Sequence, residues 1–189
     1  MMAARAMRVI SGASARLPAE VYWRMARYRH RVFVERLGWL LDTHDGAQTD
    51  QFDRADTVYV AVEDGEGNIA GCARLLPTVR PYLLGDTFPQ LFNGLAPPRD
   101  PAVWELSRLA AMDLTHETSS SLANFSSPAT AVLMREVLAC AAVQGARRLI
   151  TASPLGLERL IRRLGLVAHR AGPPTLLNGQ PVFACWIDI

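Results

Sequence analysis

The sequence predicts an α/β domain in which helices flank a mixed sheet. Amphipathic segments of helical period alternate along the 189 residues with short apolar segments of strand type. Half of the residues are hydrophobic and a fifth are charged, which is the composition of a soluble globular protein with a sizeable core. Because no internal repeat or low-complexity linker interrupts this pattern, we expect one domain over residues 1–189, with residues 1–16 as a flexible N-terminal segment.

The first half of the chain predicts a helix followed by a hairpin. Residues 17–38 form an apolar stripe of helical spacing that begins near a proline and stops at Gly38. Residues 43–56 are polar and turn-prone, which indicates a loop. The sequences TVYVAVE (57–63) and IAGCARLLP (69–77) flank the turn sequence DGEGN, so they predict two antiparallel strands.

The second half predicts strands that alternate with helices. Residues 78–101 are rich in proline and glycine and indicate an irregular, partly helical connection, which leads to an apolar strand over 103–112. Ser127 suits the N-cap of the next helix. The remaining segments are predicted to be a helix, a strand, a helix and two terminal strands, at residues 126–145, 146–153, 154–165, 166–172 and 180–189.

The composition also limits the class of partner and the compartment. A net charge of +2 gives no general case for nucleic-acid binding. No apolar run reaches transmembrane length and no signal peptide is evident, so we expect a cytoplasmic protein without membrane contact. The three cysteines have neither metal-ligand nor disulfide spacing and suit buried positions in a reducing compartment; no motif pairs Cys72 with a histidine.

The basic residues are distributed unevenly. Two segments are rich in arginine, one early and one late: Arg24, Arg27, Arg29 and Arg31, then Arg147, Arg148, Arg159, Arg162, Arg163 and Arg170. A local basic patch of this kind attracts an acidic partner, although a solvated helix face is the alternative interpretation.

The strand VWELSRLAAM carries two opposite charges, Glu105 and Arg108, among apolar residues. Ionisable groups in such surroundings are costly unless they are paired or functional. Since residues three apart face opposite sides of a regular strand, the strand must bulge or bend near Ser107 if both serve one site. Six such groups are positioned to form a buried cluster or a structural ion-pair network: Arg29, Arg74 and Arg108 with Asp50, Asp53 and Glu105.

An ordered set of motifs gives these charges a functional interpretation. The motifs RHRVFVERLGW, DQFD, GCARLLP, DTFPQLF and WELSR occur in this order between about residues 22 and 165. The set resembles the signature of the autoinducer synthases of the LuxI type, which make N-acyl-homoserine lactones. The resemblance implies a GNAT-like fold. The chain has SSPATAV in place of the glycine-rich pyrophosphate loop of coenzyme-A-dependent acetyltransferases, which agrees with an acyl donor on a carrier protein.

The resemblance implies a reaction between two substrates and no further cofactor. The amine of S-adenosylmethionine attacks the thioester of an acyl-acyl carrier protein, and the product then closes to a lactone and releases methylthioadenosine. Glu105 is the candidate base, and either Arg108 or Arg29 could hold the substrate carboxylate. The apolar neighbours of Glu105 would raise the pKa of its carboxyl group, and a nearby arginine would lower that pKa. The residues expected on the S-adenosylmethionine side are Arg29, Phe33, Trp39, Asp50, Asp53, Arg74 and Arg108.

The acyl chain and the carrier protein need separate surfaces. We expect an apolar acyl pocket for a medium, unsubstituted chain near octanoyl, with ordinary core packing as the alternative. Its candidate residues are Phe88, Trp104, Leu122, Phe125, Met134, Leu138, Leu149 and Thr151. The acidic carrier would dock on the late arginines, Arg147, Arg148, Arg159, Arg162 and Arg163. No residue spacing indicates a metal site. The competing hypotheses are an acetyltransferase that uses coenzyme A and a regulatory module that binds an acyl ligand or an acidic protein.

Overall fold

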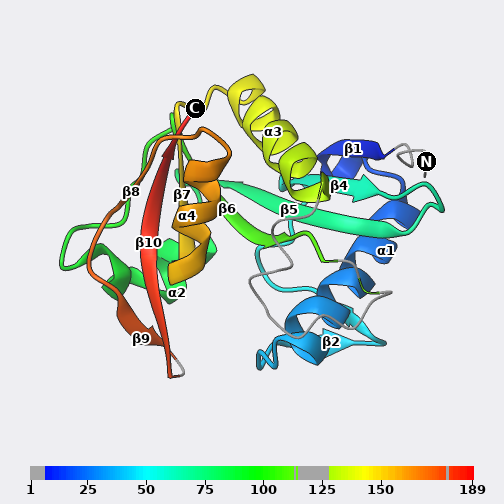
Figure 1. Cartoon of the computed structure of the whole chain (residues 1–189), viewed down its shortest axis with the longest axis horizontal. Coiled ribbons are helices and arrows are strands. Elements are labelled where there is room, and N and C mark those ends of the chain that lie inside the picture. Colours follow the sequence, from blue (N-terminus) through cyan, green and yellow to red (C-terminus); the bar gives the residue numbers. More distant parts are fainter. Residues whose placement is uncertain (1–6, 113, 115–127, 178) are drawn as a thin grey trace. The chain divides into compact units, whose positions relative to one another are not determined.

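The computed structural model of the chain describes residues 7–112, 114, 128–177 and 179–189 (Figure 1). These residues form two compact units. The first unit comprises the described residues within 1–74 and 108–137, and the second those within 75–107 and 138–189. Strands in both units pair mostly antiparallel and are flanked by helices, which confirms the predicted mixed α/β fold class.

The first unit is built on the hairpin of strands β4 (Val58–Glu63) and β5 (Ile69–Pro77). Every residue of β4 is buried, so this strand lies in the middle of the core. Strand β1 (Arg8–Ala13) pairs antiparallel with β4, from Arg8 opposite Glu63 to Ala13 opposite Val58. No local pattern in the sequence indicated β1, and the expectation of a flexible N-terminal segment over residues 1–16 stays a prediction.

Helix α1 (Ala19–Arg29) continues directly into a π-helical segment, η2 (His30–Arg36). The wider turn is visible in the backbone, because the N–H of Leu37 donates to the carbonyl of Val32, five residues earlier. Gly38, with φ +67°, follows this segment, as the sequence predicted. The buried side of α1 and η2 packs against Tyr59, Ala61 and Cys72 of the hairpin.

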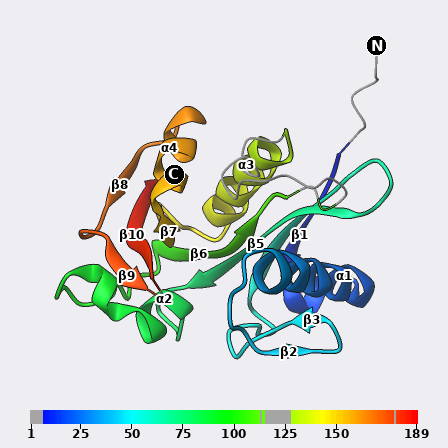
Figure 2. The same ribbon diagram turned by 60° about the horizontal axis from the view of Figure 1, so that its bottom comes forward.

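Two short strands, β2 (Thr43–His44) and β3 (Ala47–Gln48), interrupt the predicted loop over 43–56. They form their own two-stranded sheet, and β3 contacts α1 (Figure 2). Strands of two residues give no periodicity, so the sequence could not reveal them.

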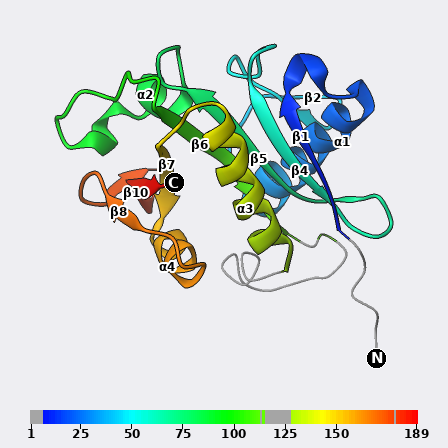
Figure 3. The same cartoon turned by 90° about the horizontal axis from the view of Figure 1, so that it is seen from above.

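The second unit is centred on strand β10 (Gln180–Asp188). It pairs antiparallel with β7 (Arg148–Pro154), β8 (Ala168–Arg170) and β9 (Thr175–Leu177); Figure 3 shows β8 beside β10. Helix α4 (Leu155–Arg163) packs on β7, β8 and β10.

Strand β6 (Val103–Ala110) adds the parallel pair that makes the sheet mixed. It pairs with β7 from Val103 opposite Arg148 to Glu105 opposite Ile150. The connection before β6 contains helix α2 (Leu83–Thr87) and the 3₁₀ turn η3 (Pro89–Phe92), as its partly helical prediction anticipated.

Helix α3 (Pro128–Val143) and strands β5 and β6 are the elements whose residues belong partly to each unit. Gly145, with φ +84°, follows α3 as predicted. The predicted cap Ser127 lies outside the described residues. The expectation of a single domain stays a prediction. In the described part of the chain, every helix is too short or too polar to cross a bilayer.

Candidate active site

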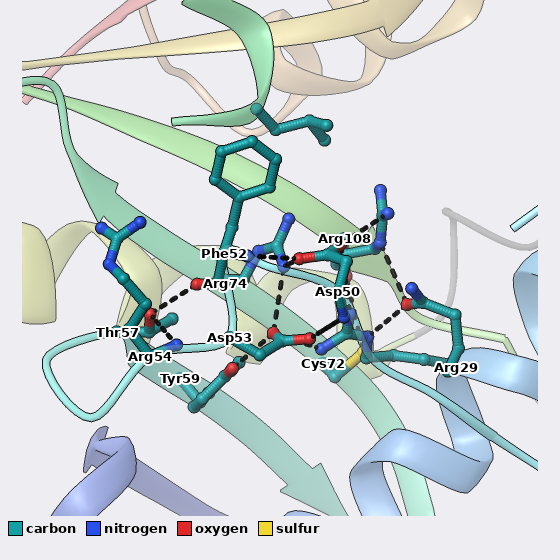
Figure 4. Close-up of polar contacts among 12 residues, drawn as sticks. Arg29, Asp50, Phe52, Asp53, Arg54, Thr57, Tyr59, Cys72, Arg74 and Arg108 are labelled. Carbon is teal, nitrogen blue, oxygen red and sulfur yellow. Dashed lines mark hydrogen bonds and ion pairs between the residues drawn. The ribbon is translucent and has the colours of Figure 1, made fainter. Parts of the chain in front are cut away.

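A network of arginine and aspartate side chains lies in the first unit, and Asp53 is its centre (Figure 4). Arg29 donates to both Asp53 oxygens, with Nη1–Oδ1 at 2.8 Å and Nη2–Oδ2 at 3.1 Å. Arg74 Nη1 donates to Asp53 Oδ1 at 3.0 Å, and the Tyr59 hydroxyl donates to the same oxygen. The paired donors of Arg29 match the two carboxylate oxygens, a geometry that fixes orientation as well as distance.

Asp50 is the second anion, and it links Arg74 to a third arginine, Arg108. Its Oδ1 accepts from Arg74 Nη1 at 2.6 Å, and its Oδ2 accepts from Arg108 Nη2 at 2.9 Å. The loop presents the two aspartates together because the N–H of Asp53 donates to the carbonyl of Asp50 and the N–H of Asp50 donates back to Asp53 Oδ2. The structure therefore places Arg29, Asp50, Asp53, Arg74 and Arg108 in one network.

Arg108 reaches the network through a distorted strand. Its φ is +53°, a left-handed conformation that is unusual for a residue other than glycine. This interrupts the alternation of β6 between Glu105 and Arg108, as the sequence required if the two residues serve one site. The interruption lies one residue beyond Ser107, the predicted position.

Burial and charge act in opposite directions on the ionisable groups of the network. Burial would raise the pKa of Asp53, but the charges of Arg29 and Arg74, together with the Arg29 and Tyr59 hydrogen bonds, hold it well below its usual value. Burial would lower the pKa of Arg29, and its pairing with Asp53 raises it instead. For Arg108, burial and the nearby charges of Arg74 and Arg29 lower the pKa to about 10, and Asp50 offsets them only in part.

Arg108 is the arginine of this network that is best placed to meet a ligand. Arg29 and Arg74 are 1% and 0% exposed, whereas Arg108 is 9% exposed. Its Nε and Nη2 donate to Gln48 and Asp50, and within the described residues its Nη1 has no hydrogen-bond partner. Among the ion pairs of the described residues, Arg108 shares Asp50 with Arg74, so its charge is only partly compensated there.

Two aromatic rings lie beside Arg108. Phe33 is buried in η2, with its ring centroid 5.8 Å from the Arg108 guanidinium carbon. Trp39 stacks on Phe33 with centroids 4.9 Å apart, and 42% of its surface is exposed. The backbone N–H of Trp39 donates to the carbonyl of Phe33, six residues earlier, and this bond holds the two residues close together. An exposed indole suits a planar or cationic ligand group.

Sequence reasoning missed Gln48 and Tyr59. Gln48 Oε1 accepts from Arg29 Nε at 2.8 Å and from Arg108 Nε at 3.1 Å, and Gln48 is buried. Gln48 is uncharged and lies in a segment that was predicted to be a polar loop, so its sequence context does not indicate that it is buried in the site. The pKa of the Tyr59 hydroxyl is raised by burial and by Asp53, so it remains a donor. Period-two alternation along β4 could have placed Tyr59 on the face of Ala61.

Glu105 lies in the second unit, in β6, and is 1% exposed. Its Oε2 accepts the N–H of Leu83 and its Oε1 accepts the N–H of Leu84, both at 2.9 Å. These are the first residues of α2, so the carboxylate caps the N-terminus of that helix and is fixed in one orientation. Its expected role with the arginine network stays a prediction.

The candidates for the acyl pocket occupy both units. Met134 of α3 is buried in the first unit; Trp104, Leu149 and Thr151 are buried and Phe88 and Leu138 half-buried in the second. Leu122 and Phe125 lie outside the described residues. The Thr151 hydroxyl has only a long 3.5 Å hydrogen bond to its neighbour's carbonyl. The pocket itself stays a prediction.

The late arginines lie exposed on the second unit. Arg148 lies over the ring of Trp186, with 4.6 Å from guanidinium carbon to centroid, and Arg162 pairs with Glu158 at 2.8 Å. Arg147, Arg159 and Arg163 make no side-chain ion pair within the described residues, so their charges are available to a partner.

The remaining candidate chemistries receive little support. Burial raises the pKa of the Cys72 thiol to about 12, outweighing the nearby arginines, so this cysteine is a poor nucleophile. Across the described ranges, no three or more His, Cys, Asp or Glu side chains are arranged to hold a metal ion. The absence of a metal remains an expectation.

Comparison with known proteins first identifies the class. A solved acyl-CoA N-acyltransferase from Pseudomonas aeruginosa shares the fold, with a TM-score of 0.62 over 97% of this chain and 100% of the other, at only 16% identity. TofI, in a ternary complex with an inhibitor and MTA, matches with a TM-score of 0.81 at 44% identity, over 96% of this chain and 91% of the other. The chain therefore shares its fold with both of these proteins.

More specific similarities define the family. The model of the autoinducer synthase family matches residues 16–189. An acyl-homoserine-lactone synthase of Acinetobacter baumannii is 50% identical over 97% of this chain and 100% of its own length. BjaI, a CoA-dependent acyl-homoserine lactone synthase with SAM and isopentyl-CoA, matches with a TM-score of 0.79 at 28% identity, over 97% of this chain and 82% of the other. The chain belongs to the autoinducer synthase family and is an acyltransferase of the acyl-homoserine-lactone synthase type.

Proposed function

We propose that this enzyme transfers an acyl chain of about eight carbons from acyl-acyl carrier protein to the amine of S-adenosylmethionine and then closes the product to a lactone. The observation that carries the proposal is the placement of Arg108, the least buried arginine of the network, whose Nη1 makes no hydrogen bond with the described residues. BjaI with SAM and TofI with MTA agree with S-adenosylmethionine as substrate and methylthioadenosine as product.

Arg108 is the best candidate for holding the substrate carboxylate, a role that the sequence left open between it and Arg29. Both Asp53 oxygens occupy the two terminal nitrogens of Arg29, and that residue is almost fully buried. Arg108 keeps Nη1 and one N–H of Nη2 for a carboxylate, which is the paired arrangement that guanidinium groups favour. The exposed ring of Trp39 is available to the rest of the substrate.

The first chemical step is acyl transfer. The amine of S-adenosylmethionine loses a proton and attacks the thioester carbonyl, so a C–N bond forms, the C–S bond breaks and the carrier thiol leaves. Glu105 is the proposed base, either directly or through one water molecule. The two backbone donors of α2 hold its carboxylate in a fixed orientation, which suits a group that must meet one particular proton.

The second step is lactonisation. The substrate carboxylate attacks the carbon next to the sulfonium, the C–S⁺ bond breaks, and neutral methylthioadenosine leaves with the electron pair. A carboxylate bound too tightly by a cation would be a weak nucleophile. Because Arg108 already shares its charge with Asp50, it can orient the carboxylate without fully neutralising it.

The acyl donor has two candidates. The exposed arginines Arg147, Arg159 and Arg163 suit an acidic carrier protein, and the SSPATAV sequence replaces a glycine-rich pyrophosphate loop. The alternative donor, acyl-coenzyme A, is favoured by the likeness to BjaI, which is CoA-dependent. Mass spectrometry of products from purified enzyme, S-adenosylmethionine and either octanoyl donor separates them. An octanoyl-homoserine lactone from the carrier-bound donor supports the proposal; no lactone from either donor would refute it.

Substitution of Arg108 by lysine is expected to raise the KM for S-adenosylmethionine at least tenfold. Lysine keeps the charge but cannot donate to Gln48, Asp50 and a carboxylate in one plane. Steady-state kinetics with each substrate varied in turn measures the effect, and the KM for the acyl donor should change much less. Arg27→Lys, on the exposed side of α1, is the control. An unchanged KM for S-adenosylmethionine in the Arg108 variant would remove this residue from the substrate site.

Charge reversal in α4 is expected to weaken carrier binding. Arg163→Glu should raise the KM for octanoyl-acyl carrier protein about five- to tenfold and leave the KM for S-adenosylmethionine unchanged, because Arg163 is exposed and has no ion pair in the described part of the chain. The difference should shrink in 0.5 M salt, where surface charges are screened. Arg27→Glu makes the same charge change on an exposed position of α1. Equal effects of the two reversals would argue against docking at α4.

A further inference from the structure

Gln48 occupies an unusual position between two cations of the active-site network. It is the last residue of β3 and is 1% exposed. One atom, its Oε1, accepts from the Nε of both Arg29 and Arg108, at 2.8 and 3.1 Å. Two donors on one side determine which end of the amide is the oxygen, because a nitrogen there would face two N–H groups.

The nitrogen of the Gln48 amide has no corresponding hydrogen bond within the described residues. Gln48 Nε2 is buried and makes no hydrogen bond with any part of the chain that the structure describes. Buried polar atoms are rarely left in this state unless another requirement outweighs the cost. The atom that is satisfied is the acceptor, so that requirement concerns the two arginines rather than the amide nitrogen.

The two arginines do not depend on Gln48 equally. Both terminal nitrogens of Arg29 are held by Asp53, so its guanidinium plane is determined without Gln48. Within the described residues, Arg108 has only one other hydrogen bond from its guanidinium, from Nη2 to Asp50. A planar group held at one point can turn about that contact, whereas a second contact at Nε fixes its plane.

We propose that Gln48 is a positioning residue that aligns the Arg108 guanidinium for the carboxylate of the substrate. The inference rests on the proposed function, since it assigns that carboxylate to Arg108. It extends the substrate site to a residue in a strand of two residues, outside the motifs that identified the family. The acceptor oxygen of residue 48 is the property that matters, so a glutamate at this position should preserve the alignment.

The test compares Gln48→Leu, Gln48→Glu and the matched control Gln51→Leu, whose residue is exposed in the same loop. Gln48→Leu should raise the KM for S-adenosylmethionine at least tenfold with a much smaller change in kcat, because substrate orientation is lost before the chemical groups are. Gln48→Glu should stay within about fivefold of wild type, and Gln51→Leu should be unchanged. A purely structural role would lower the yield of folded enzyme without raising the KM of the folded fraction.

A second measurement does not need turnover. The Nε–H resonance of Arg108 in ¹⁵N-labelled enzyme, assigned by its loss in Arg108→Lys, should shift and broaden in Gln48→Leu and remain sharp in Gln48→Glu. Wild-type KM and resonance in Gln48→Leu would overturn the inference, and so would an equal rise in KM for both Gln48 variants. If the wild-type enzyme forms no lactone, the proposed function fails first, and the resonance still reports whether Gln48 orients Arg108.

Discussion

Replacement of Glu105 by glutamine is expected to lower kcat by about 10²- to 10⁴-fold, the usual contribution of a general base. Glutamine has nearly the same shape but cannot accept the proton of the substrate amine. The affinity for S-adenosylmethionine, measured by calorimetry, should stay within a fewfold of wild type, because the proposed carboxylate contact is made by Arg108. Turnover of the variant within tenfold of wild type would exclude Glu105 as the base.

The structure adds a complication that the experiment must address. Both Glu105 oxygens accept backbone N–H groups from α2, and in the variant one of these donors would face an NH₂ group instead. The mismatch costs about 1–3 kcal/mol and weakens the start of the helix. Gly85→Ala is the control, because an added Cβ would overlap the ring of Tyr82 and disturb α2 without removing the carboxylate. A loss of kcat as large in this control would assign the effect to the helix.

Replacement of Asp53 by asparagine is expected to lower the free energy of unfolding by about 3–5 kcal/mol, the cost of breaking a buried ion pair from one side. Asp53 is 2% exposed at its side chain and accepts from Arg29, Arg74 and Tyr59. Urea unfolding followed by circular dichroism at pH 7 measures the change. Asp45→Asn makes the same substitution at an exposed position of the same loop and should change little.

Asp53 is also expected to make the free energy of unfolding depend on pH in the acid range. The pKa of Asp53 is lower in the folded protein than the value of about 3.9 expected when unfolded. The unfolded chain therefore binds this proton more readily, so the stabilisation is complete above pH 5 and is lost as the pH falls below about 4. Asp53→Asn should flatten the dependence in this range. A variant as stable as wild type at pH 7, with the same slope in acid, would contradict the role of Asp53 as the centre of the network.

The sequence predicted those parts of the molecule in which a local pattern carries information. Helical spacing identified α1, alternation and a turn identified the β4–β5 hairpin, and the cost of charges in apolar strands identified Arg74 and Arg108. Strand β1 is ordered by its pairing with β4, which is distant in sequence and leaves no local pattern.

The missed features of the site have the same origin. Gln48 is neutral, so no sequence pattern predicts its burial. Its place in the site is visible only in the tertiary contacts with Arg29 and Arg108. The capping of α2 by Glu105 joins segments about twenty residues apart, and a helix of five residues has too few positions to show a periodicity. Local sequence patterns therefore predicted which charged residues form the site, whereas the orientation of each side chain is visible only in the folded structure.

The left-handed backbone at Arg108 has a consequence for engineering this enzyme. A conformation of this kind costs about 1–3 kcal/mol for a residue with a side chain, and glycine would adopt it freely. Glycine at position 108 would relieve this backbone cost, but it would also remove the buried contacts with Asp50 and Gln48 and the proposed anchor for the substrate carboxylate. A campaign to stabilise the enzyme therefore has to keep arginine at position 108 despite its strained backbone, and to measure lactone production in every round.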